Sequence, residues 1–237
     1  MTALMFIGVV VIGYLLGSIP FGLIISKRFA RTDIRDVGSG KIGMTNVMRA
    51  AGKKAAAVSL ILDIAKGTAA VLIAGAIFRE TTDTVAVVLT LNKSAQILGG
   101  FAAIAGHNWS IFLKFKGGRG VATFMGGLAA LYWPAALVGA MFLFGIGFRT
   151  KYMSLGSIIG AITAFIMLMS FYVAKIDFLQ PYPSFEYVLY AMFGSIFIYI
   201  MHRDNILRLF NGTERKIGEK SKAEITPSTD IPNKFYR

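Results

Sequence analysis

Residues 121–148 read VATFMGGLAALYWPAALVGAMFLFGIGF, an apolar stretch of 28 residues without a charged side chain. A single helix needs about 20 such residues to cross a bilayer, so this stretch is too long for one ordinary span. The tripeptide Tyr-Trp-Pro occupies residues 132–134, near its middle. Proline ends or kinks a helix at the residue before it, and tyrosine and tryptophan favour the membrane interface. We therefore expect two short spans, at 121–131 and 135–148.

Five other apolar runs have the length of a membrane span or close to it. They lie at residues 4–25, 55–78, 85–105, 153–174 and 185–201. The chain is 55% hydrophobic with a mean hydropathy of +0.63, whereas a soluble domain of this size has shorter apolar runs with polar faces. We predict an all-α polytopic membrane protein with seven transmembrane helices. Because Asn92-Lys93-Ser94 interrupts the run at 85–105, residues 85–91 are alternatively an external or re-entrant piece.

The positions of the basic residues predict how the spans are oriented. Of 25 lysines and arginines, 21 fall in four segments, at 27–54, 114–119, 149–151 and 203–237. Seven spans place all four segments on one side, whereas six spans would move the last two to the other side. Since basic residues collect in cytoplasmic loops, we expect the N-terminus outside and the C-terminus in the cytoplasm. Residues 1–217 form the expected membrane domain, and 218–237 a flexible cytoplasmic tail.

The net charge of +13 and the absence of cysteine limit the possible functions. In a soluble protein this charge would suggest nucleic-acid binding, but here the cytoplasmic loops account for it. Without cysteine, disulfides, thiolate catalysis and cysteine metal sites are excluded. No basic segment precedes the first apolar run, so we expect a retained span there, not a signal peptide.

Three polar tracts, rich in glycine, amide and basic residues, adjoin these spans, and the expected topology puts them on one membrane face. They read GSGKIGMTNVMR at 38–49 (the first tract), GHNWSIFLKFKGGRG at 106–120 (the second tract) and HRDNILRLFNGTE at 202–214 (the third tract). Lipid contacts do not require such residues. Backbone N–H groups at a helix start and arginine side chains do bind phosphate groups. The tracts therefore predict a site for a phosphate-bearing ligand at the membrane surface.

The first tract formally contains the dinucleotide-binding pattern GxGxxG at 38–43. That pattern requires a strand–turn–helix unit, and membrane spans flank it here, so we set the nucleotide interpretation aside. The glycines can still expose N–H groups to an anion ahead of the next helix. Further donors follow at Ser39, Thr45, Asn46 and Arg49. The alternative is a tight loop whose charges are solvated.

The other two tracts each have a functional and a structural interpretation. Lys-Gly-Gly-Arg-Gly at 116–120 precedes an apolar helix and either binds a phosphate or acts as a basic stop signal at anionic lipid headgroups. His107 either titrates or caps this loop. His202 and Asn205 are three residues apart and share a face if the helix continues, where they bind a ligand or are structural.

Two pairs of polar residues inside or beside the spans have a simpler interpretation. Asp63 and Lys66 lie at i and i+3 within an apolar run, and we expect a mutual ion pair that faces the bundle. Ser154 and Ser157 either bond a substrate oxygen or are helix-packing residues.

The chain resembles the acyl-phosphate:glycerol-3-phosphate acyltransferase family of bacterial membranes (PlsY). The resemblance runs from about residue 17 to 214, and three motifs carry it: DIRDVGSGKIGMTNVMR at 33–49, GHNWSIFLKFKGGRGVAT at 106–123 and the third tract. It implies a multi-pass enzyme of the bacterial plasma membrane, with seven spans and three cytoplasmic motif loops. The implied reaction moves a fatty acyl group from acyl phosphate to the 1-hydroxyl of sn-glycerol 3-phosphate, giving lysophosphatidic acid and phosphate. It implies no cofactor or metal, and we expect a monomer.

The resemblance also implies roles for residues at matching positions. Those expected to act in catalysis are Arg49, Arg119, His202 and Asn205. Those expected to bind substrate are Ser39, Gly40, Lys41, Gly43, Thr45, Asn46, Gly117, Gly118, Ser154 and Glu214. Acyl phosphate is an activated mixed anhydride, so catalysis rests on holding two anions together. The proton of the attacking hydroxyl passes either to a substrate phosphate or to His202.

This chain departs from the family pattern at four positions. Lys41 replaces the usual asparagine, Met44 a small alanine, Ser110 a proline and Arg119 a lysine. Arginine keeps the charge with a different geometry, so we expect phosphate binding to survive. The departures also fit a diverged paralogue with another rate or donor preference.

Two other functions remain as alternatives. An anion transporter would also use broken helices and basic loops, but with polar residues at mid-bilayer. An acyltransferase of the His-x4-Asp type, using acyl-CoA or acyl carrier protein, is disfavoured because neither His107 nor His202 has aspartate five residues later.

Overall fold

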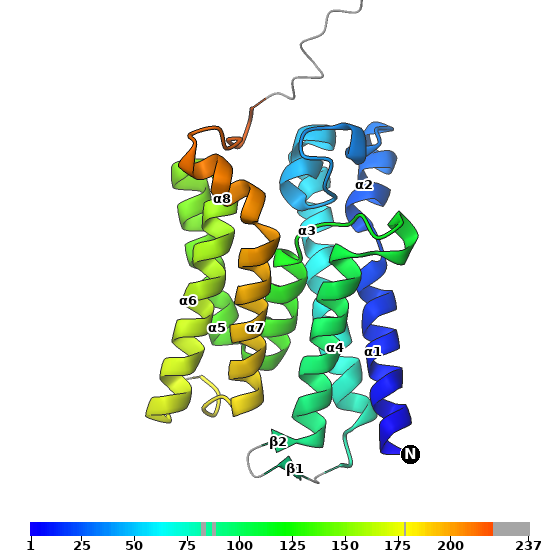
Figure 1. Ribbon diagram of the computed structural model, residues 1–237, viewed down its shortest axis with the longest axis vertical. Coiled ribbons are helices and arrows are strands. Elements are labelled where there is room, and N and C mark those ends of the chain that lie inside the picture. The colour runs from blue at the N-terminus through cyan, green and yellow to red at the C-terminus, as the bar shows by residue number, and fades with distance from the viewer. Residues whose placement is uncertain (82–83, 87–88, 178, 220–237) are drawn as a thin grey trace, which may run out of the picture.

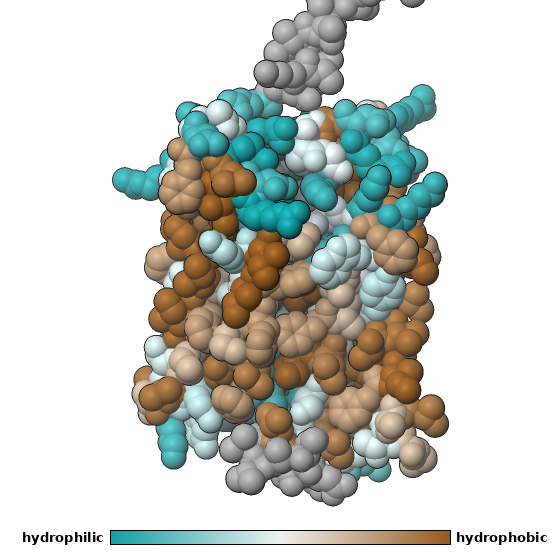
Figure 2. Space-filling view, in the orientation of Figure 1, coloured by the Kyte–Doolittle hydropathy of each residue, from teal (hydrophilic) through white to brown (hydrophobic). Residues whose placement is uncertain are grey.

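Six long helices run side by side and form a bundle (Figure 1). The computed structural model describes residues 1–81, 84–86, 89–177 and 179–219. The helices of the bundle are α1 (Thr2–Ser18), α3 (Met44–Ile77), α4 (Leu91–Asn108), α5 (Val121–Thr150), α6 (Met153–Ala174) and α7 (Phe185–Met201). The shorter elements α2 (Phe21–Ala30), η1 (Ile34–Asp36), η2 (Ile111–Leu113) and α8 (Arg203–Phe210) follow or connect them at one end. A brown apolar band covers the middle of the bundle, and hydrophilic residues gather at that end (Figure 2).

Helix α5 is bent back on itself at the predicted break. Tyr132 has φ −152° and ψ 88° within the element, and Pro134 follows. The Cε atom of Met125 lies 3.1 Å from the position of a Cβ on Gly139, although a straight helix would separate these residues by about 21 Å. The first arm packs on α3, because Gly126 abuts the carbonyl of Ile64, and the second packs on α6. The break predicted at residues 132–134 is confirmed.

The bundle contains helices that can cross a membrane. When helices are counted by length and apolarity alone, fewer than the predicted seven qualify as spans. Among the described residues, four helical segments are long and apolar enough to cross a bilayer: Thr2–Ala30, Met44–Ile77, Val121–Thr150 and Met153–Ala174. Helices α7 and α8, which meet at 59°, give a fifth if they form one broken span. The protein is therefore an all-α polytopic membrane protein.

Two predicted runs differ from the helices that form. The run at 4–25 is broken between α1 and α2, where Pro20 precedes Phe21. The run at 85–105 becomes helical only at Leu91; residues 84–86 (β1) and 89–90 (β2) pair as antiparallel strands instead. The hydroxyl of Thr90 accepts from the N–H of Lys93 and starts α4. The polar Asn92 lies in this first turn and caps the end of α3 by donating to the carbonyls of Gly75 and Phe78.

The first tract enters α3 through a short helical arm. Gly52 has φ 83° and ψ 177° inside the helix, a backbone conformation that favours glycine. The arm that begins at Met44 therefore turns away from the long part of α3, which begins close to residue 55 as predicted. Most of the expected tail at 218–237 lies outside the described residues.

Candidate active site

An open cavity at the polar end of the bundle is lined by all three tracts. Counting its open mouth, it encloses about 1150 Å³ of empty space. The predicted site residues that line it are Ser39, Lys41, Gly43, Thr45, Asn46, Arg49, Arg119, Ser154, His202, Asn205 and Glu214. Gly40, Gly117 and Gly118 are not among its lining residues. Segments more than 150 residues apart in sequence thus meet at one site.

Asn46 shapes the first tract from within. Its amide nitrogen lies 2.9–3.0 Å from the carbonyl oxygens of Ile34, Val37 and Lys41, and its Oδ1 accepts from the N–H of Ser39 at 3.2 Å. A side chain on Gly38, which has φ 56°, would collide with this amide. The polar groups of Asn46 are therefore engaged by the loop itself, and they hold Ser39 and Lys41 at the wall of the cavity.

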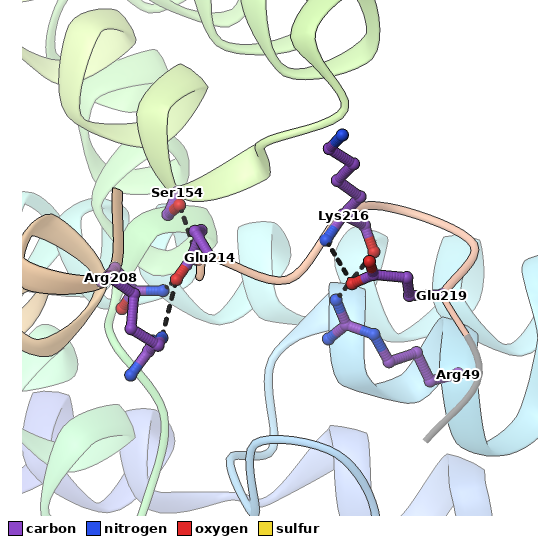
Figure 3. A network of polar contacts seen from close by, with 7 residues as sticks. Arg49, Ser154, Arg208, Glu214, Lys216 and Glu219 are labelled. Carbon is purple, nitrogen blue, oxygen red and sulfur yellow. Dashed lines mark hydrogen bonds and ion pairs between the residues drawn. The ribbon is translucent and has the colours of Figure 1, made fainter. Parts of the chain in front are cut away.

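Arg49 extends from the α3 arm towards the C-terminal segment. Its Nη2 donates to the carbonyl oxygen of Lys216 at 3.2 Å, and Glu219 accepts from the N–H of Lys216 at 2.9 Å. Figure 3 shows this contact beside the Glu214 cluster. A single bond to a neutral carbonyl leaves most of the guanidinium's five donors for an anion in the cavity.

The second tract presents Arg119, not its glycine N–H groups. Gly117 and Gly118 donate to the carbonyl oxygens of Asn108 and His107, each at 3.0 Å, so these two N–H groups are already used. Arg119 follows at the start of α5, in contact with the cavity. Burial lowers the pKa of its guanidinium, and the charge of Glu214 opposes that shift. Arginine remains protonated throughout the physiological range, so a partly buried cation faces the cavity.

Glu214 ties the third tract to α6. Its Oε1 accepts from Ser154 Oγ at 2.8 Å and from Asn205 Nδ2 at 2.6 Å, and its Oε2 accepts from Arg208 Nε at 2.8 Å (Figure 3). Burial raises the pKa of the Glu214 carboxyl, but the hydrogen bonds from Asn205, Ser154 and Arg208 outweigh it and leave the pKa lowered. Glu214 is therefore an ionised carboxylate that holds these three side chains in place by accepting their hydrogen bonds.

His202 and Asn205 keep one polar atom each for a ligand. The Nδ1 atom of His202 lies 2.8 Å from the carbonyl oxygen of Ile198, so Nδ1 carries the proton and Nε2 is the acceptor of a neutral ring. The Oδ1 atom of Asn205 is buried and has no hydrogen-bond partner among the described residues. Both residues line the cavity, where each acceptor suits a substrate hydroxyl.

The cavity also has polar walls that the sequence interpretation did not include. Asp63 and His107 line it beside the first two tracts, and Arg208 and Arg215 line it near Glu214. Sequence spacing paired Asp63 with Lys66, but nothing local connects it to His107, 44 residues later. Within the described ranges, no three His, Asp or Glu side chains converge as metal ligands would.

The sequence model of the family described as glycerol-3-phosphate acyltransferase matches residues 7–212. The chain belongs to this family. The acyltransferase is 47% identical over 215 residues to "Glycerol-3-phosphate acyltransferase 3" of Dehalococcoides mccartyi, covering 90% of this chain and 96% of that protein. It is 43% identical to the glycerol-3-phosphate acyltransferase of Brucella anthropi, covering 92% and 96%. The resemblance carried by the three tracts is confirmed, and the protein is an integral membrane enzyme.

Two crystal structures of PlsY, an integral membrane glycerol 3-phosphate acyltransferase, share the fold of this acyltransferase. The glycerol 3-phosphate form has a TM-score of 0.75 at 35% identity, covering 93% of this chain and 98% of that one. The lysophosphatidic acid form has a TM-score of 0.73 at 34% identity, covering 89% and 94%. These likenesses span most of the chain.

Met44 and Arg119 are accommodated in the acyltransferase without disrupting the loops. Met44 is the first residue of α3 and packs against two of the buried apolar clusters while lining the cavity. Lys41 contributes its carbonyl oxygen to Asn46, as any residue can. Ser110 donates to the carbonyl oxygen of Ser18 at 2.6 Å. The departures from the family pattern therefore keep the backbone of the site.

Replacing Glu214 by alanine should lower the thermal stability of the acyltransferase in detergent. Ser154, Asn205 and Arg208 would lose their common acceptor, and we expect the melting temperature to fall by about 5–10 °C. Because the pKa of Glu214 is lowered in the folded state, this stabilisation is present at neutral pH and is lost as the pH falls below the ordinary carboxyl range. The difference from wild type should therefore shrink in acid. Glu219→Ala is the control, and an equal shift for both variants would contradict the assignment.

Proposed function

We propose that the enzyme transfers a fatty acyl group from acyl phosphate to the 1-hydroxyl of sn-glycerol 3-phosphate, releasing inorganic phosphate. The observation that carries this proposal is a cavity with cationic walls that opens onto an apolar groove. Arg49 and Arg119 are the cations, and Leu60, Ile64 and Phe144 are among the apolar residues of the same cavity. Two anions, one of them with a hydrocarbon chain, match such walls.

The groove begins where the two arms of α5 face α3. Besides Ile64, Met125 and Ala140, which it shares with the cavity, it is lined by Ala129, Trp133, Ala136 and Leu137. The acyl chain lies along this groove, with its phosphate near Arg119 at the start of α5. From Val121 to Trp133 the helical arm measures roughly 18 Å. An extended chain covers about 1.2 Å per backbone atom, so the arm matches roughly 15 carbon atoms.

Glycerol 3-phosphate occupies the side of the cavity nearer the first and third tracts. Arg49, Ser39 and Thr45 hold its phosphate, and His202 and Asn205 orient its two hydroxyl groups. The hydroxyl oxygen attacks the acyl carbonyl carbon, the bond from that carbon to the phosphate oxygen breaks, and the hydroxyl proton passes to the departing phosphate. Because the donor is an activated anhydride, no covalent enzyme intermediate is needed, and positioning with charge neutralisation supplies the catalysis.

We place the cavity on the cytoplasmic side of the bacterial plasma membrane. Counting each arm of α5 as a short crossing, α1 with α2, α3, α4, the two arms, α6 and α7 make seven spans. The basic segments then share one side with the cavity, and the positive-inside rule makes that side cytoplasmic with the N-terminus outside. Accessibility of single cysteines introduced at Thr2 and Lys53 to a membrane-impermeant thiol reagent tests this orientation.

The donor assignment is tested by supplying purified enzyme with glycerol 3-phosphate and either palmitoyl phosphate or palmitoyl-CoA. We expect lysophosphatidic acid and stoichiometric phosphate from palmitoyl phosphate, and no product from palmitoyl-CoA. Product from palmitoyl-CoA alone would overturn the assignment. When reconstituted in liposomes, the enzyme should not carry phosphate across the membrane. An anion transporter would do so, and the measurement therefore distinguishes the two functions.

Narrowing the groove should shorten the preferred acyl chain. Ala129 lines the groove beyond the part that it shares with the cavity, so Ala129→Phe should lower kcat/KM for palmitoyl phosphate by about tenfold or more. The effect on octanoyl phosphate should be less than about threefold, since a short chain ends before the obstruction. Ile166→Phe, on an exposed part of α6, is the control. A uniform loss across chain lengths would contradict the placement of the acyl chain.

A further inference from the structure

Asp63, Lys66 and His107 form a buried cluster beside the second tract, and Asp63 and His107 also reach the wall of the cavity. Their exposed fractions are 1%, 4% and 3%. Lys66 Nζ lies 2.9 Å from Asp63 Oδ1, and His107 Nδ1 lies 3.5 Å from the same oxygen. The ion pair expected within α3 is thus present, and it has a third member from α4. Buried charges within a membrane bundle are costly, so a function for the cluster is expected.

The cluster connects four elements of the bundle. Lys66 also donates to the carbonyl oxygen of Ile19 at 3.0 Å, at the break between α1 and α2. Asp63 belongs to the long part of α3, and His107 to the last turn of α4. Through Lys66 and His107, the Asp63 carboxylate therefore links the α1–α2 break, α3 and the end of α4, from which the second tract departs.

The second tract lies directly against His107. The N–H of Gly118 donates to the carbonyl oxygen of His107 at 3.0 Å. The imidazole also fills the space beside Gly118, where any Cβ would collide with its Nε2. A shift of the imidazole would therefore move Gly118 and, with it, the next residue, Arg119. The charges that act on Arg119 itself lie between residues 204 and 215, among them Glu214 and Arg208, so we infer that Asp63 affects Arg119 through the loop.

We propose that Asp63, Lys66 and His107 are positioning residues that set the place of Arg119 in the cavity. Asp63 fixes the imidazole of His107 in orientation, and Lys66 fixes Asp63 by anchoring it to the α1–α2 break. The imidazole then holds Gly118 from one side while its own main-chain carbonyl holds the N–H of Gly118. The inference rests on the role proposed above for Arg119 in binding the phosphate of the acyl donor.

A double-mutant cycle between Asp63 and Arg119 tests this inference, because residues that act as a unit give non-additive losses. We expect Asp63→Asn to lower kcat/KM for acyl phosphate by about 100-fold, and Arg119→Gln by about 1,000-fold. The double variant should lie within about threefold of Arg119→Gln alone, because a displaced loop matters little once its arginine is gone. By contrast, Asp63→Asn combined with Ser154→Ala should show the product of the two single losses.

The outcomes separate this inference from the role of Arg119. A double variant that shows the full product of both losses would overturn the inference alone, since Asp63 would then act independently of the loop. Full activity of Arg119→Gln by itself would overturn the role of Arg119 and, with it, the inference. Should Asp63→Asn fail to fold, His107→Gln enters the same cycle with the same expectation. Glu186→Gln, a buried carboxylate at the other end of the bundle that accepts from the N–H of Thr90, is the control and should leave activity unchanged.

Discussion

Replacing Arg49 by alanine is expected to lower kcat/KM for glycerol 3-phosphate by about 1,000-fold, through loss of charge-assisted, bidentate hydrogen bonds to a phosphate. The residue lines the cavity, and its one described hydrogen bond runs to the carbonyl oxygen of Lys216 at 3.2 Å. A phosphate dianion is a far stronger partner than a neutral carbonyl, so substrate should displace Lys216. Steady-state kinetics with varied glycerol 3-phosphate measure the loss.

The lysine variant separates charge from geometry at this position. Arg49→Lys keeps the positive charge and loses the planar fork that matches a phosphate, so we expect an intermediate loss of about 10- to 100-fold. The melting temperature should change little in either variant, because the bond to Lys216 is weak and partly exposed. Arg203→Ala is the matched control: this arginine lies at the same end of the bundle with a side chain 80% exposed. If Arg49→Ala and Arg203→Ala had equal activity, the proposed role of Arg49 in binding the substrate phosphate would be wrong.

The apolar pattern predicted the long helices, but it predicted only some of the breaks within them. The break at residues 132–134 was predictable because proline and interfacial aromatic residues coincide there. The break between α1 and α2 was missed although Pro20 marks it, since the apolar run continues on both sides. The start of α4 at Leu91 follows from Thr90, which caps the helix; hydropathy does not register such a cap. Gly52 turns α3 through a positive φ that no periodicity in the sequence reveals.

The site residues were predictable as a set and less so in their roles. Spacing and composition brought the three tracts to one face, and the cavity does collect them. The sequence could not reveal that Asn46 turns inward to hold its own loop, or that the N–H groups of Gly117 and Gly118 are used by α4. These partners are set by how the backbone folds. Asp63 and His107 meet because α3 and α4 are neighbours, a tertiary fact that local spacing does not contain.

Replacing His202 by alanine should lower kcat by about 100- to 1,000-fold, the range expected when a group that contacts the attacking hydroxyl is removed. Its Nε2 is the acceptor of a neutral ring because Nδ1 lies against the carbonyl oxygen of Ile198. Asn205, one turn later, offers a second buried acceptor through Oδ1. We expect Asn205→Asp to lose activity as well, because a second carboxylate beside Glu214 would repel the substrate phosphates.

The surroundings of His202 argue that the proton goes to the departing phosphate. A histidine that takes a proton becomes a cation, and a nearby carboxylate normally stabilises it. Here burial and the guanidinium of Arg119 lower the pKa of the ring, and the hydrogen bond to the Ile198 carbonyl and the charge of Glu214 offset this only in part. A second positive charge next to Arg119 is unfavourable. His202 is therefore expected to hold the hydroxyl in place and remain neutral through the reaction.

The choice between these roles can be measured with His202→Gln, whose amide oxygen can accept a hydrogen bond but cannot take up the proton. If His202 only orients the hydroxyl, His202→Gln should recover activity to within about 30-fold of wild type and exceed His202→Ala by about tenfold or more. Its pH–rate profile should then keep the shape of the wild-type profile. If His202 is the general base, glutamine should be no better than alanine, and the acidic limb of the wild-type profile, where protonation of His202 lowers the rate, should disappear. That second pattern would show that His202, and not the departing phosphate, accepts the proton of the hydroxyl.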